Sequence, residues 1–427
     1  MKPFKVKFGA KNLTGNAGLV NFGKFAKKLQ LPKTLERMIT IQRGHTADYS
    51  IADVVMILIM GALGGIKHIS HLSILRCDSV IRKLFGWAKF PDNRTFSRIF
   101  ALFNHKYCNE LHEAETIIRP KVWSKKWFGR VTLDLDSTVI GVNGSQEGAE
   151  KGYNPKKKGQ KSYHPLLCFI AETKECLHSW FRTGCAYTSN GASEFIKECA
   201  SRLPKRVWSI IVRADSGFFD NTFLKTLEKL GYKYLIKVKM KNLPNLLMSQ
   251  KWQKAKGKSD IETTEFWYKC AGWDKPRKFV AIRKLVEQTT DTLFPIPKYE
   301  FFAYVTSLTI SPLKAHKFYG QRSTSENWIE WCKNQMACGT IRTQDFWSNS
   351  AIFQTTILAY HDMVWMMWMS QDKYFCQEPN TVRAWLIQVP AKLISRSRQL
   401  ILTLSDDFIF KERWLSIENL ICQLKFS

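Results

Sequence analysis

The chain has 427 residues, and its 65 Lys and Arg against 36 Asp and Glu give a formal net charge of +29. Because 45% of the residues are apolar and 13% aromatic, this is not the composition of a disordered basic tail. No run of about 20 apolar residues and no apolar signal segment occurs, so we expect neither a membrane span nor secretion. The 11 cysteines include no C-x-x-C pair, which favours reduced thiols in a cytoplasmic protein. The positive charge indicates a polyanionic partner, and nucleic acid is the obvious one.

Residues 1–125 are predicted to form a helical N-terminal region that binds DNA. The apolar stretch at 47–62 is typical of a buried helix, and the run Pro91 to Thr95 resembles a helix start, with Phe96 and Phe100 at helical spacing behind it. Basic helices upstream of a core could contact DNA as a helix-turn-helix. A plain helical bundle would have the same pattern, and no recognition helix can be chosen.

From residue 130 the apolar residues follow a period of two, because Val131, Leu133 and Leu135 alternate with polar residues. The next predicted elements are strands at 166–171, 176–182, 207–212 and 234–238, and helices at 190–204 and 220–230. Their order, β-β-β-α-β-α-β, is the outline of a ribonuclease-H-like α/β domain with a mixed sheet. We assign the first part of this catalytic core to residues 126–240.

The segment 241–298 interrupts that order. Alternation at 263–268 and at 278–284 predicts a β-rich insertion with several tryptophans. The second part of the core, 299–375, begins with a strand at 300–308. Two helices are predicted to follow, at 314–336 and 353–369.

Residues 376–427 have apolar residues at helical spacing, including Trp385, Leu386 and Leu393. We therefore predict a helical C-terminal region that is a candidate for dimerisation. Its apolar residues could instead cover the catalytic core.

Three acidic residues are predicted to be catalytic. Asp136 lies on the first strand, Asp215 lies just past the fourth, and Glu326 lies on the helix after the insertion. In a ribonuclease-H-like fold the first and fourth strands are neighbours, so these carboxylates would converge. Carboxylates gathered together repel one another unless divalent cations neutralise them. We therefore predict a site for two Mg²⁺ ions, which Mn²⁺ could replace, and phosphoryl transfer as the reaction.

The predicted helix that holds Glu326 presents a stripe of polar residues. Arg322, Glu326 and Lys333 follow Tyr319 at offsets of 3, 7 and 14 residues. At about 100° per residue these side chains occupy a stripe of roughly 60° on one face. A carboxylate would then be flanked by a phenol, a guanidinium and an ammonium that suit phosphate binding. A solvated charged face is the alternative interpretation.

This Y-x(2)-R-x(3)-E-x(6)-K spacing resembles the signature of DDE-type transposases of bacterial insertion sequences. Three further stretches resemble conserved boxes of the family, namely Asp136-Ser137-Thr138, the Gly- and Lys-rich segment 152–166, and Arg213 to Phe218. The resemblance covers roughly residues 90–370.

The resemblance implies a ribonuclease-H-like core with a β-strand insertion. It also implies that the protein binds the terminal inverted repeats of an insertion sequence and target DNA, cleaves the ends and transfers strands with Mg²⁺. The DNA complex would contain a homodimer, and the location would be the bacterial cytoplasm, at the nucleoid.

Several assignments stay open. Asp134 and Asp136 point to the same face of their strand, and the family pattern, with aspartate before Ser-Thr, favours Asp136. A basic run near Asp136 is predicted to track a phosphate backbone rather than to be a solvated loop; it consists of Lys156, Lys157 and Lys158. Trp273 is either an insertion-core residue or, as in related transposases, a tryptophan that stacks on a flipped base, and Trp267 and Trp252 are further candidates.

Two other functions remain possible from sequence. The first is a catalytically silent, transposase-derived DNA-binding protein, against which three intact acidic residues argue. The second is a ribonuclease-H-like nuclease or resolvase, which would need neither the insertion nor the stripe.

Overall fold

The computed structural model describes residues 2–45, 47–126, 128–152, 154, 157–187, 189–258, 260–288, 297–370 and 377–426. The chain divides into two compact units. The first comprises Met1–Lys126, Gly144–Glu147 and Glu330–Ser427, and the second comprises Trp127–Asn143 and Gly148–Ile329. Across the described residues, no helix combines the length and apolar character needed to cross a membrane.

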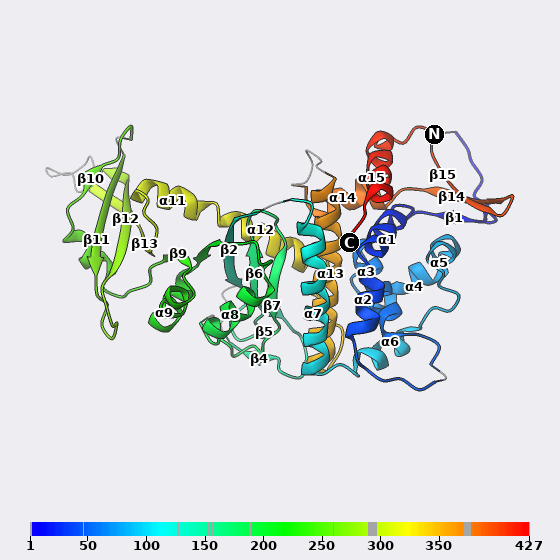
Figure 1. Cartoon of the computed structure of the whole chain (residues 1–427), viewed down its shortest axis with the longest axis horizontal. Helices are drawn as coiled ribbons and strands as arrows, with labels where there is room; N and C mark the ends of the chain where they lie inside the picture. Colours follow the sequence, from blue (N-terminus) through cyan, green and yellow to red (C-terminus); the bar gives the residue numbers. More distant parts are fainter. Residues whose placement is uncertain are drawn as a thin grey trace. The chain divides into compact units, whose positions relative to one another are not determined.

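The first unit is mainly helical (Figure 1). Its N-terminal part contains α1 (Leu19–Lys28), α2 (Leu31–Met38), α3 (Ile51–Leu63), η1 (Ile69–Leu72), α4 (Ser73–Cys77), α5 (Ser79–Phe85), α6 (Asn93–Phe100) and α7 (His105–Trp123). Its C-terminal part contains η3 (Trp331–Gln335), α13 (Phe346–Met369), α14 (Pro379–Val382), η4 (Arg383–Ile387) and α15 (Lys411–Gln423).

Helix boundaries in this unit follow from local side-chain chemistry. Ser50 caps α3 by accepting a hydrogen bond from the Asp53 backbone N–H, and Asp92 caps α6 in the same way. α13 is buried along almost its whole length and packs against α3 and α7, so its Met and Trp side chains form core rather than surface.

The prediction of a helical C-terminal region over 376–427 is wrong in its middle part. A β-hairpin lies there, made of β14 (Ala391–Arg396) and β15 (Gln399–Leu404), and β14 also pairs with the short strand β1 (Leu13–Thr14). The physical reason is Pro390, which has no backbone N–H and disfavours the helical conformation of the residue before it. Beyond the proline, burial alternates with a period of two, as in a strand with one buried face.

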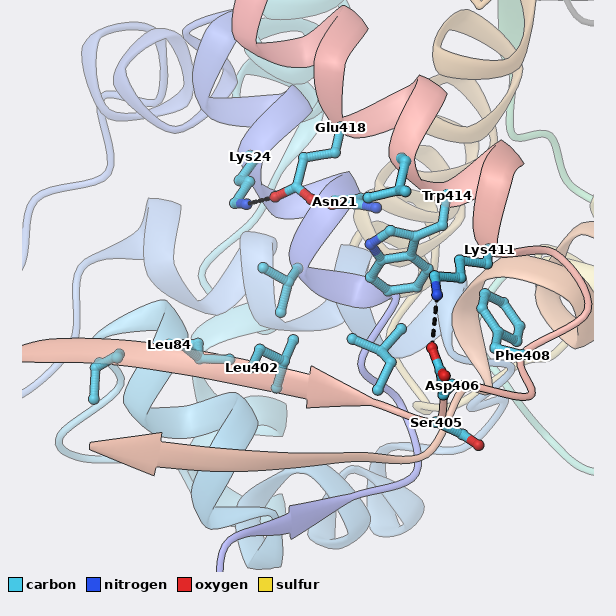
Figure 2. A pocket seen from close by; sticks show the side chains of 14 residues that line it. Asn21, Lys24, Leu84, Leu402, Ser405, Asp406, Phe408, Lys411, Trp414 and Glu418 are labelled. Carbon is cyan, nitrogen blue, oxygen red and sulfur yellow. Dashed lines mark hydrogen bonds and ion pairs between the residues drawn. The ribbon is translucent and has the colours of Figure 1, made fainter. Parts of the chain in front are cut away.

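A groove of about 470 Å³ lies in the first unit beside this hairpin. Figure 2 shows Leu402 and Phe408 on one side of it, and Trp414 and Glu418 of α15 and Lys24 of α1 on the other. Trp414 belongs to a small apolar cluster with Ala17, Val389 and Ala391, against which Leu402, Leu404 and Phe408 pack. The C-terminal segment therefore covers the core of the first unit.

The second unit is built on a nine-stranded sheet of order β10-β11-β12-β13-β9-β8-β2-β6-β7. Its strands are β2 (Arg130–Ser137), β6 (Leu166–Ile170), β7 (Cys176–Trp180), β8 (Ser209–Ala214), β9 (Lys233–Lys237), β10 (Gln253–Lys254), β11 (Ile261–Tyr268), β12 (Arg277–Gln288) and β13 (Pro297–Thr306). β2, β8 and β9 run parallel, whereas β6 and β7 continue the sheet in antiparallel fashion. The helices are α8 (Ala192–Arg202), η2 (Ser216–Phe218), α9 (Asn221–Lys229), α10 (Leu243–Met248), α11 (Pro312–Gly320) and α12 (Ser323–Glu330), and a small sheet contains β3 (Ile140–Gly141), β4 (Glu150–Lys151) and β5 (Lys161–Tyr163).

The inserted strands do not form a separate sheet. β13 pairs with β12 along most of its length, and its last residues also pair with β9 of the central strands. The insertion is therefore a lateral extension of the same sheet, held by backbone hydrogen bonds.

The predicted continuous helix over 314–336 is wrong. α11 ends at Gly320, α12 starts at Ser323, and the chain continues in the π-helical turn η3. Hydroxyl groups explain the break, because Ser323, Thr324 and Ser325 each donate to the backbone carbonyl three residues earlier. Such local bonds compete with a regular helix. The single-face stripe computed for a straight helix therefore does not apply.

Candidate active site

Strands β2 and β8 bring two of the predicted carboxylates to one edge of the large sheet. The strands are parallel neighbours, and Leu135 is paired in register with Ala214. Asp136 and Asp215 directly follow these residues, so both lie toward the carboxyl ends of adjacent strands. Ligand sites in α/β sheets form at such an edge.

Asp215 is held by the turn that follows β8. Its carboxylate accepts a hydrogen bond of 2.9 Å from the backbone N–H of Gly217, at the start of η2. The residue thus acts as an N-cap, while remaining half-buried rather than enclosed.

Asp136 is paired with Arg322. The two side chains approach to 2.9 Å, and the same guanidinium donates to the Leu135 carbonyl at 3.2 Å. Burial raises the pKa of the Asp136 carboxyl to about 6; Arg322 opposes this rise, and the negative charges of Asp215 and Glu326 add to it. The carboxyl group thus lies where its negative charge is only partly compensated.

Glu326 and Tyr319 complete the cluster. Arg322 reaches Glu326 at 3.5 Å, although the Glu326 side chain is 64% exposed and free to reorient. Burial raises the pKa of the Tyr319 phenol to about 12, so it stays protonated and can donate a hydrogen bond. The charge of Arg322 opposes this rise in the pKa of Tyr319, and the charges of Asp136, Asp215 and Glu326 add to it.

Asp134 has a different environment from Asp136. Its side chain is fully buried, and both oxygens accept hydrogen bonds from Arg213, at 2.7 and 2.8 Å. Arg213 also donates to the Phe318 carbonyl at 2.6 Å and lies over the Phe318 ring. The pair thereby joins β2, β8 and the end of α11, just before Tyr319.

Comparison with known proteins identifies the family. Residues 1–426 match the family described as transposase DDE domain group 1. The chain belongs to this transposase family. A search of curated proteins finds no match.

Among solved structures, the chain is similar to a piggyBac transposase in a synaptic complex with hairpin DNA, with 13% identity over 86% of this chain and 79% of that chain, and a TM-score of 0.42. Two Mos1 transposase structures, a paired-end complex with the left transposon end and a pre-cleavage transpososome, give TM-scores of 0.18 and 0.17 at 12% and 11% identity. Each match covers 45% of this chain and 61% of that chain. With TM-scores below 0.5, these similarities carry no conclusion of their own.

DDE transposases in general depend on divalent metal ions, and the donor set of this transposase suits a hard cation. Asp136, Asp215 and Glu326 supply carboxylate oxygens only, which Mg²⁺ prefers. Burial keeps the pKa of Asp136 raised even with Arg322 beside it. Within the described parts of the chain, no three His, Cys, Asp or Glu side chains are grouped closely enough to hold an ion. The exposed Glu326 would therefore have to reorient.

The other predicted site residues lie on other elements. Lys333 is in η3, which belongs to the first unit, and Lys157 and Lys158 are exposed in the turn between β4 and β5. Lys156 lies outside the described residues. Trp273 is half-buried, with Phe219 at 5.2 Å between ring centroids and Arg277 over its ring.

The two alternative tryptophans also differ. Trp252 is half-buried, and its ring faces Arg283 at 4.7 Å. Trp267 on β11 is 71% exposed, and is therefore the most accessible of the three indole rings.

Sequence reasoning missed the role of Arg213. An arginine inside an otherwise apolar strand signals a buried carboxylate partner, because an unpaired buried charge is costly. That signal was present in the sequence, but the partner follows only from the register, which sets Arg213 opposite Asp134.

His164 lies between β5 and β6. Its Nε2 lies 3.1 Å from the Ser137 hydroxyl and its Nδ1 lies 2.6 Å from the Ala186 carbonyl. Both ring nitrogens are thus engaged by neighbouring groups, beside the strand end that carries Asp136.

Proposed function

We propose that this transposase binds the ends of a bacterial insertion sequence and catalyses Mg²⁺-dependent cleavage and strand transfer, in cut-and-paste transposition. The single observation that carries the proposal is the meeting of Asp136 and Asp215 at the ends of adjacent parallel strands, with Glu326 linked to Asp136 through Arg322. A binding protein has no need of this mutually repelling set of carboxylates.

We further propose a ribonuclease-H-like core. The central strand order β9-β8-β2-β6-β7, with β2, β8 and β9 parallel and β6 and β7 antiparallel, supports it. It corresponds to three consecutive antiparallel strands extended on one side by two parallel strands with helical connections, which is the topology expected of that fold. The strands of the insertion extend the sheet beyond β9.

In this proposal Asp136, Asp215 and Glu326 hold two Mg²⁺ ions, which Mn²⁺ could replace. When bound, the ions supply activation of the attacking oxygen and stabilisation of the leaving oxygen. Arg322 holds Asp136 in place and attracts the Glu326 carboxylate toward the same site, and the protonated Tyr319 donates to a phosphate oxygen.

The remaining assignments concern DNA and assembly. Lys333 and the run Lys156, Lys157 and Lys158 contact phosphates, and Trp273 stacks on a base near the cleaved end. The helical region 1–125 binds DNA, and a homodimer brings together two terminal inverted repeats before capture of target DNA. The protein acts in the bacterial cytoplasm, at the nucleoid.

A plasmid that carries the DNA flanking the gene tests this function. Asp136→Asn, Asp215→Asn and Glu326→Gln should each abolish cleavage, since each removes a metal ligand while nearly preserving side-chain volume, and each should leave DNA binding nearly unchanged. Glu330→Gln, one helical turn after Glu326, is the matched control and should cleave normally.

Full cleavage by any of the three variants would contradict its catalytic assignment. A wild-type protein that binds the flanking DNA without cutting it in Mg²⁺ or Mn²⁺ would favour the catalytically silent alternative. Cleavage without regard to the terminal repeats would favour a nuclease or resolvase.

A further inference from the structure

The β14–β15 hairpin has two faces of different character. On the inner face, Ala391 and Leu393 are buried and Leu402 and Leu404 are half-buried, and they face the cluster that includes Trp414. Figure 2 shows Leu402 and Trp414 lining the same groove. The inner face therefore fixes the hairpin to the first unit.

The outer face is exposed. Its centre is the cross-strand pair Ile394 and Ile401, which are 40% and 44% exposed. Two polar cross-strand pairs flank the isoleucines, namely Lys392 with Thr403 and Arg396 with Gln399, and all four residues are exposed. Successive strand residues alternate between faces, so these six side chains share one surface.

The turn adds a third cation under backbone strain. Ser397 and Arg398 adopt positive φ angles of 49° and 64°, a conformation that favours glycine or asparagine in two-residue hairpin turns. An arginine in this conformation lowers the stability of the fold, and its exposed side chain gains no packing in return. This cost indicates a functional role for the residue. Among the residues that the structure describes, neither Arg396 nor Arg398 has an ion-pair partner. No acidic residue occurs between Ala391 and Leu404.

We propose that the outer face and tip of this hairpin bind double-stranded DNA; this inference rests on the proposed function. Arg396 and Arg398 would contact phosphates, and Ile394 and Ile401 would contact apolar edges of bases or sugars, with Gln399 able to read a base edge. A two-stranded β-ribbon fits the major groove, which is about 12 Å wide.

DNA fits this face better than a second copy of the chain does. A two-fold contact would set the same patch of each copy against the other, and would therefore bring Lys392, Arg396 and Arg398 near their own equivalents. No carboxylate on the hairpin could offset that repulsion. A polyanion instead complements every charge on the face.

The test is fluorescence-anisotropy titration of the full chain with a labelled random-sequence 40-base-pair duplex, between about 50 and 200 mM salt. The Arg396→Ala/Arg398→Gly variant should weaken binding and reduce the slope of log K against log salt by about 1.8, that is, by about 0.9 for each lost phosphate contact. Glycine at position 398 relieves the positive-φ strain, so the variant should still fold.

Two matched controls accompany it. Ser397→Gly relieves the same kind of strain and keeps both charges, so it should bind as the wild type does. Lys205→Ala/Arg206→Ala removes two exposed cations before the start of β8, at the opposite end of that strand from Asp215, and should leave the slope unchanged.

The outcomes separate this inference from the function it rests on. A wild-type affinity that does not depend on salt would overturn DNA binding itself. A steep wild-type slope that persists in Arg396→Ala/Arg398→Gly would overturn the hairpin site alone. Ile394→Ser/Ile401→Ser should weaken binding several-fold at an unchanged slope; if it instead converts a dimer to a monomer in sedimentation and leaves the DNA affinity intact, the face joins copies of the chain and the proposal is wrong.

Discussion

Asp134 and Asp136 lie two residues apart on one strand, and burial raises the pKa of both carboxyls, yet their partners differ. Asp134 has two hydrogen bonds from a buried guanidinium, which satisfy it within the fold. Asp136 has one ion-pair partner, Arg322, a hydrogen bond from its neighbour's backbone N–H at Ser137, two negative neighbours and a side chain that is 15% exposed. A carboxylate with two negative neighbours is suited to bind a further positively charged group.

The pH dependence of the free energy of unfolding should reveal the raised pKa of Asp136. Burial raises the pKa of Asp136 to about 6, whereas an unfolded aspartate ionises near 3.9. The folded state therefore holds the proton more tightly than the unfolded state does. The stability contributed by the protonated form is complete below about pH 4 and is lost as pH rises through about 6.

In chelator-treated protein, the free energy of unfolding of Asp136→Asn, measured in urea, should rise relative to that of the wild type between about pH 4 and 6. The increase should be at most about 3 kcal/mol. If the free energies of unfolding of the two proteins change in parallel over this range, the pKa of the Asp136 carboxyl is not raised in the folded state. Added Mg²⁺ should stabilise the wild type above pH 6 and have little effect on the variant.

At the scale of elements, the Asp134–Arg213 pair connects β2 and β8 to Phe318 in the last turn of α11, directly before Tyr319 and four residues before Arg322. Because α11 and α12 are separated by a bend, the direction of Arg322 depends on how the end of α11 is held. The buried pair is therefore a positioning device for the side chains that face Asp136.

Arg213→Ala leaves a buried carboxylate unpaired and should lower the free energy of unfolding by about 3–5 kcal/mol. Arg206→Ala, an exposed arginine before the same strand, should change it by less than about 0.5 kcal/mol. Urea denaturation measures both. Asp134→Asn should also destabilise the fold, whereas Asp136→Asn should not at neutral pH; the reverse result would exchange the roles assigned to the two aspartates.

At the scale of the molecule, the first unit is assembled from distant parts of the sequence. Arg383 of η4 is buried and donates to the carbonyls of Ala62, Leu63 and Gln335, and the cluster around Trp414 includes Ala17. The C-terminal segment is thus part of the core of the unit that contains the N-terminal helices.

Truncation after residue 378 should therefore unfold much of the first unit, because it exposes this cluster and leaves the partners of Arg383 unsatisfied. Hydrogen exchange should show lost protection in α1 and α3, with the strands of the large sheet less affected. Removal of residues 2–11, whose side chains are exposed, is the control and should leave protection unchanged. A truncated protein with full protection in α1 would show that the segment is dispensable for folding.

Elements with local signals can be predicted from the order of the residues alone. The alternation around Leu133 and Leu135 indicated β2, the helix start at Pro91 to Thr95 indicated α6, and the spacing of acidic residues selected Asp136, Asp215 and Glu326 for attention. Periodicity and capping depend on neighbours within a few residues, so they can be read without knowledge of the fold.

Features that depend on distant partners follow from the packing of the folded chain. The register of β2 and β8 paired Asp134 with Arg213 and left Asp136 for Arg322. The covering of an apolar cluster that includes Ala17, far away in the chain, fixed the residues after Pro390 as a hairpin. In each case several local conformations were open to the segment, and the contacts made by residues far away in the chain selected one of them, because burial and hydrogen bonding outweigh local propensity.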